Sequence, residues 1–138
     1  MIGIIGLGFV GGSMYKSFKL KGFDVIGYDK FKNGGIGSFE ETLAANIIFL
    51  CLPTLFDEKK KEYNKNAIHE ICSKLVEYSY NGLVVIKSTI EPETTNVLSD
   101  THPSLKFCHN PEFLTARTAF EDFHNQTHIV LGKGKNCV

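Results

Sequence analysis

The 138-residue sequence has no tryptophan, only four prolines and four cysteines, and no excess charge of either sign, with 15 Lys and Arg against 15 Asp and Glu. The missing basic excess argues against nucleic-acid binding, and the missing acidic excess argues against a disordered chain. No apolar run approaches the roughly 20 residues of a membrane span. The cysteines form no C-x-x-C pair and no secretory signal opens the chain, so we expect reduced thiols in a cytoplasmic protein without a membrane partner.

Glycine, in contrast, is abundant, and three glycines follow the first apolar segment in a G-x-G-x-x-G pattern. Gly6 would allow a tight turn out of the strand, Gly8 would leave room for a phosphate, and Gly11 would let the next helix pack closely. The free N–H groups at the start of that helix favour an anion. The sequence therefore predicts a pyrophosphate cradle made by Gly6, Leu7, Gly8, Phe9, Val10 and Gly11.

A second apolar segment, residues 24–28, ends at Asp29. Asp29 follows Gly11 at close to the spacing of about 20 residues that places an acid on the adenosine ribose. Such a carboxylate accepts hydrogen bonds from the ribose and repels a 2′-phosphate, which predicts NAD rather than NADP. Lys30 and Lys32 could accommodate a phosphate, and a solvated turn is the structural alternative for Asp29.

Short runs rich in Val, Ile and Leu alternate with segments of helical period along the whole chain. This alternation predicts an α/β fold with a parallel sheet buried on both faces. The predicted strands are residues 2–5, 24–28, 47–51, 83–87, 106–109 and 128–131. We therefore expect a Rossmann-type, doubly wound six-stranded parallel sheet in three αβα layers, with strand order 3-2-1-4-5-6 and a crevice between the first and fourth strands.

Helices are expected over residues 10–20 and 66–78, and Ser38 to Glu41 form a capping box that starts a short helix. The second helix carries an apolar face. Its members are Ile68, Ile71, Cys72, Leu75 and Val76. Residues 57–65 are expected to be a solvated loop, and residues 1–138 a single nucleotide-binding domain.

Ligands of such sheets bind beyond the carboxyl ends of the strands, where this sequence has polar and proline-bearing turns. Pro53 and Thr54 follow the third predicted strand, Thr89 the fourth, and Glu112 the fifth. Glu112 is suited to act as a general base if it reaches a substrate hydroxyl or a water. The bland alternative is that Asn110, Pro111 and Glu112 simply start a helix.

Several of these segments together resemble the N-terminal domain of the UDP-glucose/GDP-mannose dehydrogenase family, and its UDP-glucose 6-dehydrogenases in particular. The most specific is Asn-Pro-Glu-Phe-Leu at residues 110–114. The others are the glycine loop, Cys-Leu-Pro-Thr at 51–54, Lys-Ser-Thr-Ile at 87–90, Asp-Phe at 122–123 and His-Ile-Val-Leu-Gly at 128–132. The similarity extends over essentially the whole chain.

The resemblance implies oxidation of the C6 alcohol of a nucleotide sugar, UDP-glucose, to a carboxylate with two NAD molecules, through an aldehyde and a cysteine-bound thioester. It implies catalytic roles for Glu112 and for Thr89, which would lie beside the nicotinamide, and cofactor contacts from Pro53 and Thr54. Glu112, Phe113 and Leu114 would contact the substrate. The structural alternatives are a strand-end role for Thr89 and core packing for Phe113 and Leu114.

The sequence departs from the family pattern in several places. Leu55 replaces a second proline, Ala116 replaces a second glutamate, and the segment between Asp29 and the third predicted strand is short. The nucleophilic cysteine belongs to the family's C-terminal domain, so we expect the central and C-terminal domains to be absent here. The chain would then be either a truncated or degenerate form, or one half of an enzyme whose other half is a separate chain.

Two other functions are compatible with the sequence: a non-enzymatic NAD-sensing module, and a fragment of a related hydroxy-acid dehydrogenase. Two local patterns carry less weight. Cys108 and His109 are adjacent on a predicted strand and would point to opposite faces. His124 and His128 have the i, i+4 spacing of a metal pair but lack the accompanying acid, and we expect no metal.

Overall fold

A computed structural model describes residues 1–114, 116–127 and 129–135 of the chain. The strands are β1 (Ile2–Ile5), β2 (Val25–Tyr28), β3 (Ile47–Leu50), β4 (Phe56–Asp57), β5 (Glu62–Tyr63), β6 (Leu83–Ile86), β7 (Lys106–His109) and β8 (Gly132–Lys133). The α-helices are α1 (Phe9–Leu20), α2 (Phe39–Thr42), α3 (Asn66–Glu77), α4 (Thr94–Thr101) and α5 (Ala119–His124). Two short 3₁₀ turns, η1 (Lys32–Gly34) and η2 (Ala116–Thr118), complete the described elements.

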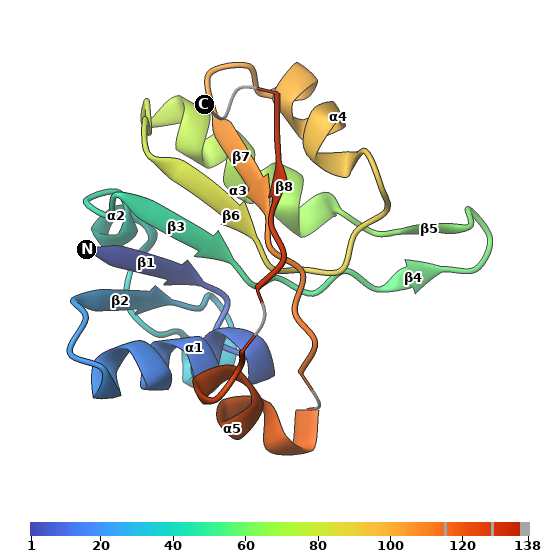
Figure 1. Cartoon of the computed structure of the whole chain (residues 1–138). Helices are drawn as coiled ribbons and strands as arrows, with labels where there is room; N and C mark the ends of the chain where they lie inside the picture. Colours follow the sequence, from blue (N-terminus) through green and yellow to red (C-terminus); the bar gives the residue numbers. More distant parts are fainter. Residues whose placement is uncertain (115, 128, 136–138) are drawn as a thin grey trace.

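Six strands form one sheet in the order β2-β1-β3-β6-β7-β8, which confirms the doubly wound α/β class (Figure 1). The first five are parallel, whereas β8 pairs with β7 antiparallel. The sixth predicted strand, residues 128–131, is wrong: residues 129–131 are exposed and irregular, His128 lies outside the described residues, and the strand begins at Gly132.

The predicted strand order is also wrong, because the third strand along the chain lies beside β1 and not outside β2. Between β2 and β3 the chain forms only the turn η1 and the single-turn helix α2. That segment is too short to add a strand beyond β2 and return, so β2 is an edge strand. The point where the chain reverses direction across the sheet therefore lies between β1 and β3, not between the first and fourth strands.

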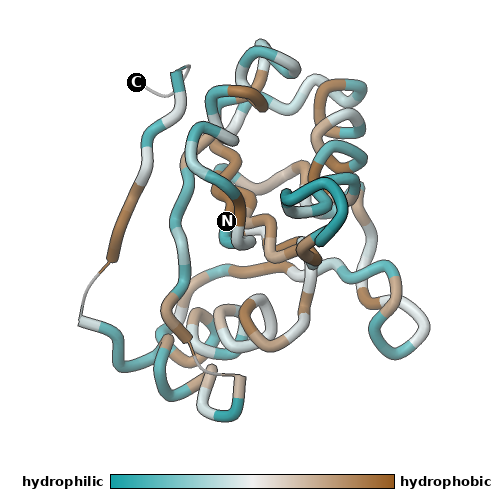
Figure 2. The backbone as a smooth tube through the Cα atoms, turned by 90° about the vertical axis from the view of Figure 1, so that its right-hand side faces the viewer, coloured by the Kyte–Doolittle hydropathy of each residue, from teal (hydrophilic) through white to brown (hydrophobic). Residues whose placement is uncertain are grey.

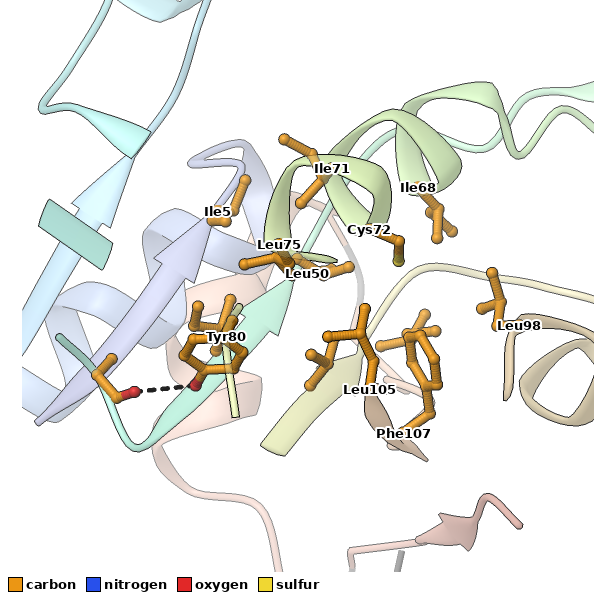
Figure 3. Close-up of a cluster of buried hydrophobic side chains, with 14 of the residues drawn as sticks. Ile5, Leu50, Ile68, Ile71, Cys72, Leu75, Tyr80, Leu98, Leu105 and Phe107 are labelled. Carbon is orange, nitrogen blue, oxygen red and sulfur yellow. Dashed lines mark hydrogen bonds between the residues drawn. The ribbon is translucent and has the colours of Figure 1, made fainter. Parts of the chain in front are cut away.

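Helices cover both faces of the sheet, as a three-layer fold requires (Figure 1). On one face, α1 and α5 pack against each other and against β1 and β2 through a cluster that includes Ile4, Met14 and Phe123. On the other face lies a larger cluster (Figure 3). Figure 3 shows Leu75 of α3 close to Leu50. The Tyr80 hydroxyl donates to the Ala45 carbonyl at 2.9 Å.

The predicted helices are confirmed almost to the residue. Ser38 Oγ accepts the Glu41 N–H at 3.3 Å, so one half of the capping box caps α2. In α3 four of the five residues expected on the apolar face are buried, but Val76 is 39% exposed. Residues 57–65, expected to be a solvated loop, include β5 and the second residue of β4, and these two short strands pair as a hairpin that projects from the body (Figure 1). None of the helices in the described part of the chain is long and apolar enough to span a bilayer.

The five parallel strands pair in register, so their carboxyl ends are level. Tyr28 is opposite Ile5, Ile5 opposite Leu50, Leu50 opposite Ile86, and Ile86 opposite His109. The next residue of four of these strands continues the hydrogen bonding, because the N–H groups of Gly6, Cys51, Lys87 and Asn110 each donate to the neighbouring strand. The residues predicted to carry the chemistry follow directly from this common edge.

Candidate cofactor-binding site

The three glycines have the geometry expected of a phosphate-binding turn. Gly6 has a φ of +95° and turns the chain between β1 and α1. A Cβ on Gly11 would collide with the Gly6 carbonyl oxygen, so only glycine lets the helix approach the strand this closely. A Cβ on Gly8 would meet nothing within 4 Å, which means that the space in front of the turn is open. Gly8 caps α1 without a side chain, and no acid lies in the first turn, so the N-terminal N–H groups remain available to an anion.

Asp29 lies at the end of β2 and its carboxylate is held against the glycine turn. Oδ2 accepts the Leu7 N–H at 2.8 Å, and Oδ1 accepts the N–H groups of Phe31 and Lys32, each at 2.9 Å. Burial opposes ionisation, but these three donors and the Lys32 ammonium outweigh it and lower the pKa of Asp29. The acid is therefore an ionised acceptor that faces the cavity rather than a solvated turn residue.

A cavity of about 650 Å³ lies over the carboxyl ends of β2, β1 and β3, and α3 forms its far wall. Gly6, Gly8, Phe9, Val10, Asp29 and Pro53 are the predicted cofactor residues that line it. This volume lies within the range of small-molecule sites. The open space at Gly8, the uncapped helix start and the ionised Asp29 together fit the pyrophosphate and ribose of a dinucleotide.

A second cavity of about 350 Å³ continues from the first, since Val10, Cys51 and Leu52 line both. Its other walls are the turns after β3, β6 and β7, where it is lined by Thr54, Lys87, Ser88, Thr89 and Glu112. Two hydroxyls fasten these turns together: Thr54 Oγ1 donates to the Thr89 carbonyl at 2.6 Å, and Ser88 Oγ donates to the Leu52 carbonyl at 2.7 Å.

The structure thus brings most of the predicted site residues to one groove, with exceptions. Leu7 is buried beneath the turn and only its backbone reaches Asp29. Phe113 is 73% exposed and lines neither cavity, whereas Leu114 packs against the α1 cluster, as the core-packing alternative predicted. Residues 110–114 are not helical, so the reading of Asn110 to Glu112 as a helix start is wrong. Glu112 Oε2 instead accepts the Leu114 N–H at 2.7 Å.

Sequence reasoning missed Lys87 as a groove residue and named Lys32 only as a cation that could accommodate a phosphate. Lys32 Nζ donates to the Leu7 carbonyl at 2.6 Å and so lies over the glycine turn. Lys87 is 3% exposed and its ammonium donates to Asn110 Oδ1 at 3.0 Å. The sequence signal for Lys87 was its position directly after a buried strand. The structure adds its contact with Asn110, the first residue of the Asn-Pro-Glu-Phe-Leu motif. Within the described residues no three His, Cys, Asp or Glu side chains converge on a metal site.

The β4–β5 hairpin is tied to the turn after β6 by Glu91. Its carboxylate accepts the Tyr63 N–H and pairs with Lys65 Nζ at 2.8 Å. Burial raises the pKa of Glu91, but the hydrogen bonds from Lys65 and Tyr63 outweigh it and hold the pKa at about 2. Because Tyr63 lines the second cavity, this ion pair holds one wall of the site in place.

We expect Glu91→Gln to lower the free energy of unfolding by about 1–2 kcal/mol at pH 6, allowing for the partial exposure of the pair. The folded-state pKa of Glu91 lies below its ordinary value of 4.5, so the stabilisation is complete above about pH 4.5 and is lost as the pH falls towards 2. Urea unfolding at several pH values checks this. Lys65→Met should reproduce the loss, and a parallel pH dependence for wild type and Glu91→Gln would contradict it.

Residues 36–137 match the family model described as the UDP-glucose/GDP-mannose dehydrogenase family, NAD binding domain. The match covers more than half of the chain. The chain belongs to the UDP-glucose/GDP-mannose dehydrogenase family. The domain is that family's NAD-binding domain, so its cofactor is NAD and its enzymes are NAD-dependent oxidoreductases. The matched residues do not include the glycine turn or Asp29, whose predicted roles rest on the sequence pattern and the geometry described above.

Solved structures show the same fold at low sequence identity. A UDP-glucose dehydrogenase from Pyrobaculum islandicum has a TM-score of 0.79 and 23% identity, covering 96% of this chain and 40% of that one. A GDP-mannose dehydrogenase from Pseudomonas aeruginosa has a TM-score of 0.77 and 22% identity, with the same coverage. A UDP-D-ManNAc dehydrogenase from Pyrococcus horikoshii has a TM-score of 0.71 and 20% identity, covering 97% and 41%. The chain thus spans about two fifths of the length of these nucleotide-sugar dehydrogenases.

Proposed function

We propose that this chain is the NAD-binding part, over residues 1–138, of a dehydrogenase that oxidises the C6 alcohol of UDP-glucose. The observation that carries the proposal is the continuous groove from Asp29, past the glycine turn, to Glu112. A dinucleotide binds across the point where a doubly wound sheet changes direction, and a substrate must meet its reactive end. In this chain the groove runs from the end of β2 towards the end of β7, so we place the adenosine of NAD near β2 and its reactive end near β7.

The part of the groove near β1 and β2 would bind the adenosine and pyrophosphate of NAD mainly through backbone groups and a few charged side chains. Asp29 accepts hydrogen bonds from the ribose hydroxyls, and its ionisation disfavours a 2′-phosphate, which is consistent with NAD. The N–H groups at the start of α1 take the pyrophosphate, for which Gly8 leaves space. Lys32, already over the turn, adds a cation beside the phosphates.

The reacting half combines a carboxylate with polar turns. Glu112 takes the alcohol proton as a general base, and Thr54 fixes the turn that carries Thr89 beside the reactive ring. When bound, NAD accepts the hydride that leaves the alcohol carbon. Phe113, at the exposed end of this motif, and Leu114 shape the substrate side through their backbone.

Neither Cys51, which lines the groove, nor Cys72, which is buried in the core, is suited to be the nucleophile of the second oxidation. Burial raises the pKa of Cys51 to about 12, although the Lys87 ammonium opposes this, and burial likewise raises the pKa of Cys72 to about 12. Both are thiols at neutral pH, and the thiolate is the reactive form. The proposal therefore includes a nucleophile supplied by a further segment or a separate chain, as the resemblance to the family implies. As free thiols, Cys51 and Cys72 suit a cytoplasmic setting.

Calorimetric titration of residues 1–138 with NAD tests the cofactor site. We expect one binding site, weakened about tenfold by Asp29→Asn, because one charge-assisted acceptor for the ribose is lost. Asp57→Asn is a matched control, since Asp57 Oδ1 accepts the N–H groups of Lys59 and Lys60 in the same way but lies outside both cavities. A folded protein that produces no binding heat with NAD would refute the proposed function.

The substrate is tested by thermal protection in the presence of NAD. We expect UDP-glucose to raise the melting temperature more than GDP-mannose or UDP-N-acetylmannosamine, because the sequence resemblance is to the UDP-glucose enzymes. Stronger protection by either of the other sugars would reassign the substrate, and protection by a hydroxy acid but by none of the nucleotide sugars would refute a nucleotide-sugar substrate.

A further inference from the structure

Lys87 forms part of the floor of the second cavity and is a buried cation. It directly follows β6, where Val84 and Ile86 face the α3 cluster. Because strand residues alternate in direction, Lys87 lies on the opposite, α1-facing side of the sheet, together with Cys51 at the end of β3. It is 3% exposed, and its ammonium donates to Asn110 Oδ1 at 3.0 Å.

Burying an ammonium group has a high desolvation cost, and an amide oxygen compensates for only part of it. Burial lowers the pKa of Lys87, while the Glu112 carboxylate opposes this change, so the two charges act on the same small space. Both side chains line the second cavity. The Lys87 ammonium therefore interacts electrostatically with any group that occupies the second cavity.

The occupant follows from the direction of the groove. Asp29 and the glycine turn hold the adenosine and the pyrophosphate, so the nicotinamide end extends into the second cavity, beyond Val10. The nicotinamide ring carries one positive charge when oxidised and none when reduced. A nearby ammonium therefore discriminates between the two oxidation states, and a carboxylate discriminates in the opposite sense.

We propose that Lys87 sets the redox preference of the bound cofactor, favouring NADH over NAD⁺ and so making bound NAD⁺ a stronger oxidant of the alcohol. This inference rests on the proposed function, since it requires NAD in the groove. Glu112 partly balances Lys87. Each tenfold change in the ratio of the NAD⁺ and NADH dissociation constants corresponds to about 30 mV in the potential of the bound two-electron couple.

The test is calorimetric titration of residues 1–138 with NAD⁺ and with NADH, compared as the ratio of the two dissociation constants, NAD⁺ over NADH. Lys87→Met should lower this ratio about three- to tenfold, because a unit charge at close range is removed. Lys87→Arg keeps the charge and should keep the ratio, even if both affinities fall. Lys106→Met, at the exposed opposite end of β7, removes the same charge far from the groove and should leave the ratio unchanged.

Glu112→Gln gives an independent arm of opposite sign, and the ratio should rise. If Lys87→Met does not fold, this arm decides: an unchanged ratio in Glu112→Gln overturns the inference. If Lys87→Met folds and weakens both forms by the same factor, Lys87 only supports Asn110 and the inference is wrong. If the wild-type chain binds neither form, the proposed function fails and takes the inference with it, a result distinct from binding with an unaltered ratio.

Discussion

Replacing Gly11 with alanine is expected to destabilise the protein by about 3 kcal/mol and to abolish NAD binding. The added Cβ would collide with the carbonyl oxygen of Gly6, and backbone atoms cannot rotate out of the way as a side chain can. The start of α1 would have to move away from β1, which would also displace the N–H groups that face the pyrophosphate. Urea unfolding and calorimetry with NAD measure the two effects.

Gly8→Ala is the matched comparison and separates binding from folding. Gly8 has a φ of −73°, which alanine adopts without strain, and its Cβ would meet no atom within 4 Å. The melting temperature should change little, whereas the affinity for NAD should fall about tenfold or more, because the methyl group occupies the space required by a phosphate. Equal losses of stability in the two variants, or full NAD affinity in Gly8→Ala, would contradict this assignment.

Leu75→Ala is the second large effect, with an expected loss of about 3 kcal/mol in the free energy of unfolding. Leu75 is fully buried between α3 and the sheet, close to Leu50 (Figure 3). Its removal leaves a cavity that two rigid layers cannot close. The midpoint of urea unfolding would fall accordingly.

Val76→Ala provides the control for this substitution, one position along the same helix. Val76 is 39% exposed, so its truncation should change stability by less than about 0.5 kcal/mol. A loss in Val76→Ala comparable to that in Leu75→Ala would mean that α3 is rotated about its axis relative to the arrangement described. The pair therefore tests the orientation of the helix as well as the size of the core.

Sequence periodicity was sufficient for the elements with many consistent signals. In α3 the apolar residues at positions 68, 71, 72 and 75 predicted both the helix and its buried face, and β1 to β3, β6 and β7 were found within about a residue of their ends. Val76 was wrongly predicted to be buried. It lies at the border of the apolar face of α3, where the local sequence does not show whether a side chain faces the core or the solvent.

The order of the strands could not be read from local sequence, because it depends on where a connection crosses the sheet. Only the length of the segment between Asp29 and Ile47 bears on it, because a segment this short cannot place a strand beyond β2, which therefore lies at the edge of the sheet. The apolar run that was predicted as the last strand stays outside the core. Ile129 and Leu131 are each 65% exposed, and Figure 2 shows this stretch at the outside of the molecule.

Site residues could be predicted from the sequence where a position requires one particular residue type. Gly6 and Asp29, predicted for a tight turn and a ribose contact, line the groove, whereas Gly11, predicted for close helix packing, is buried behind it against the Gly6 carbonyl. Lys87 was missed as a groove residue because lysine is usually a solvated surface residue. Lys32 was expected only as a cation that could accommodate a phosphate. The fold reveals that Lys87 is buried and that Lys32 is bound to the glycine turn.

The carboxyl ends of the parallel strands are level, and neighbouring strands are about 4.8 Å apart. The residues that follow these strands are therefore evenly spaced along the edge of the sheet, in the order Asp29, Gly6, Cys51, Lys87 and Asn110. An extended ligand bound along this edge would meet them one after another. A shortened ligand should contact only some of these residues. Substitution of Asp29 should weaken the binding of ADP-ribose as much as that of the intact dinucleotide, whereas substitution of Lys87 should leave the affinity for ADP-ribose unchanged.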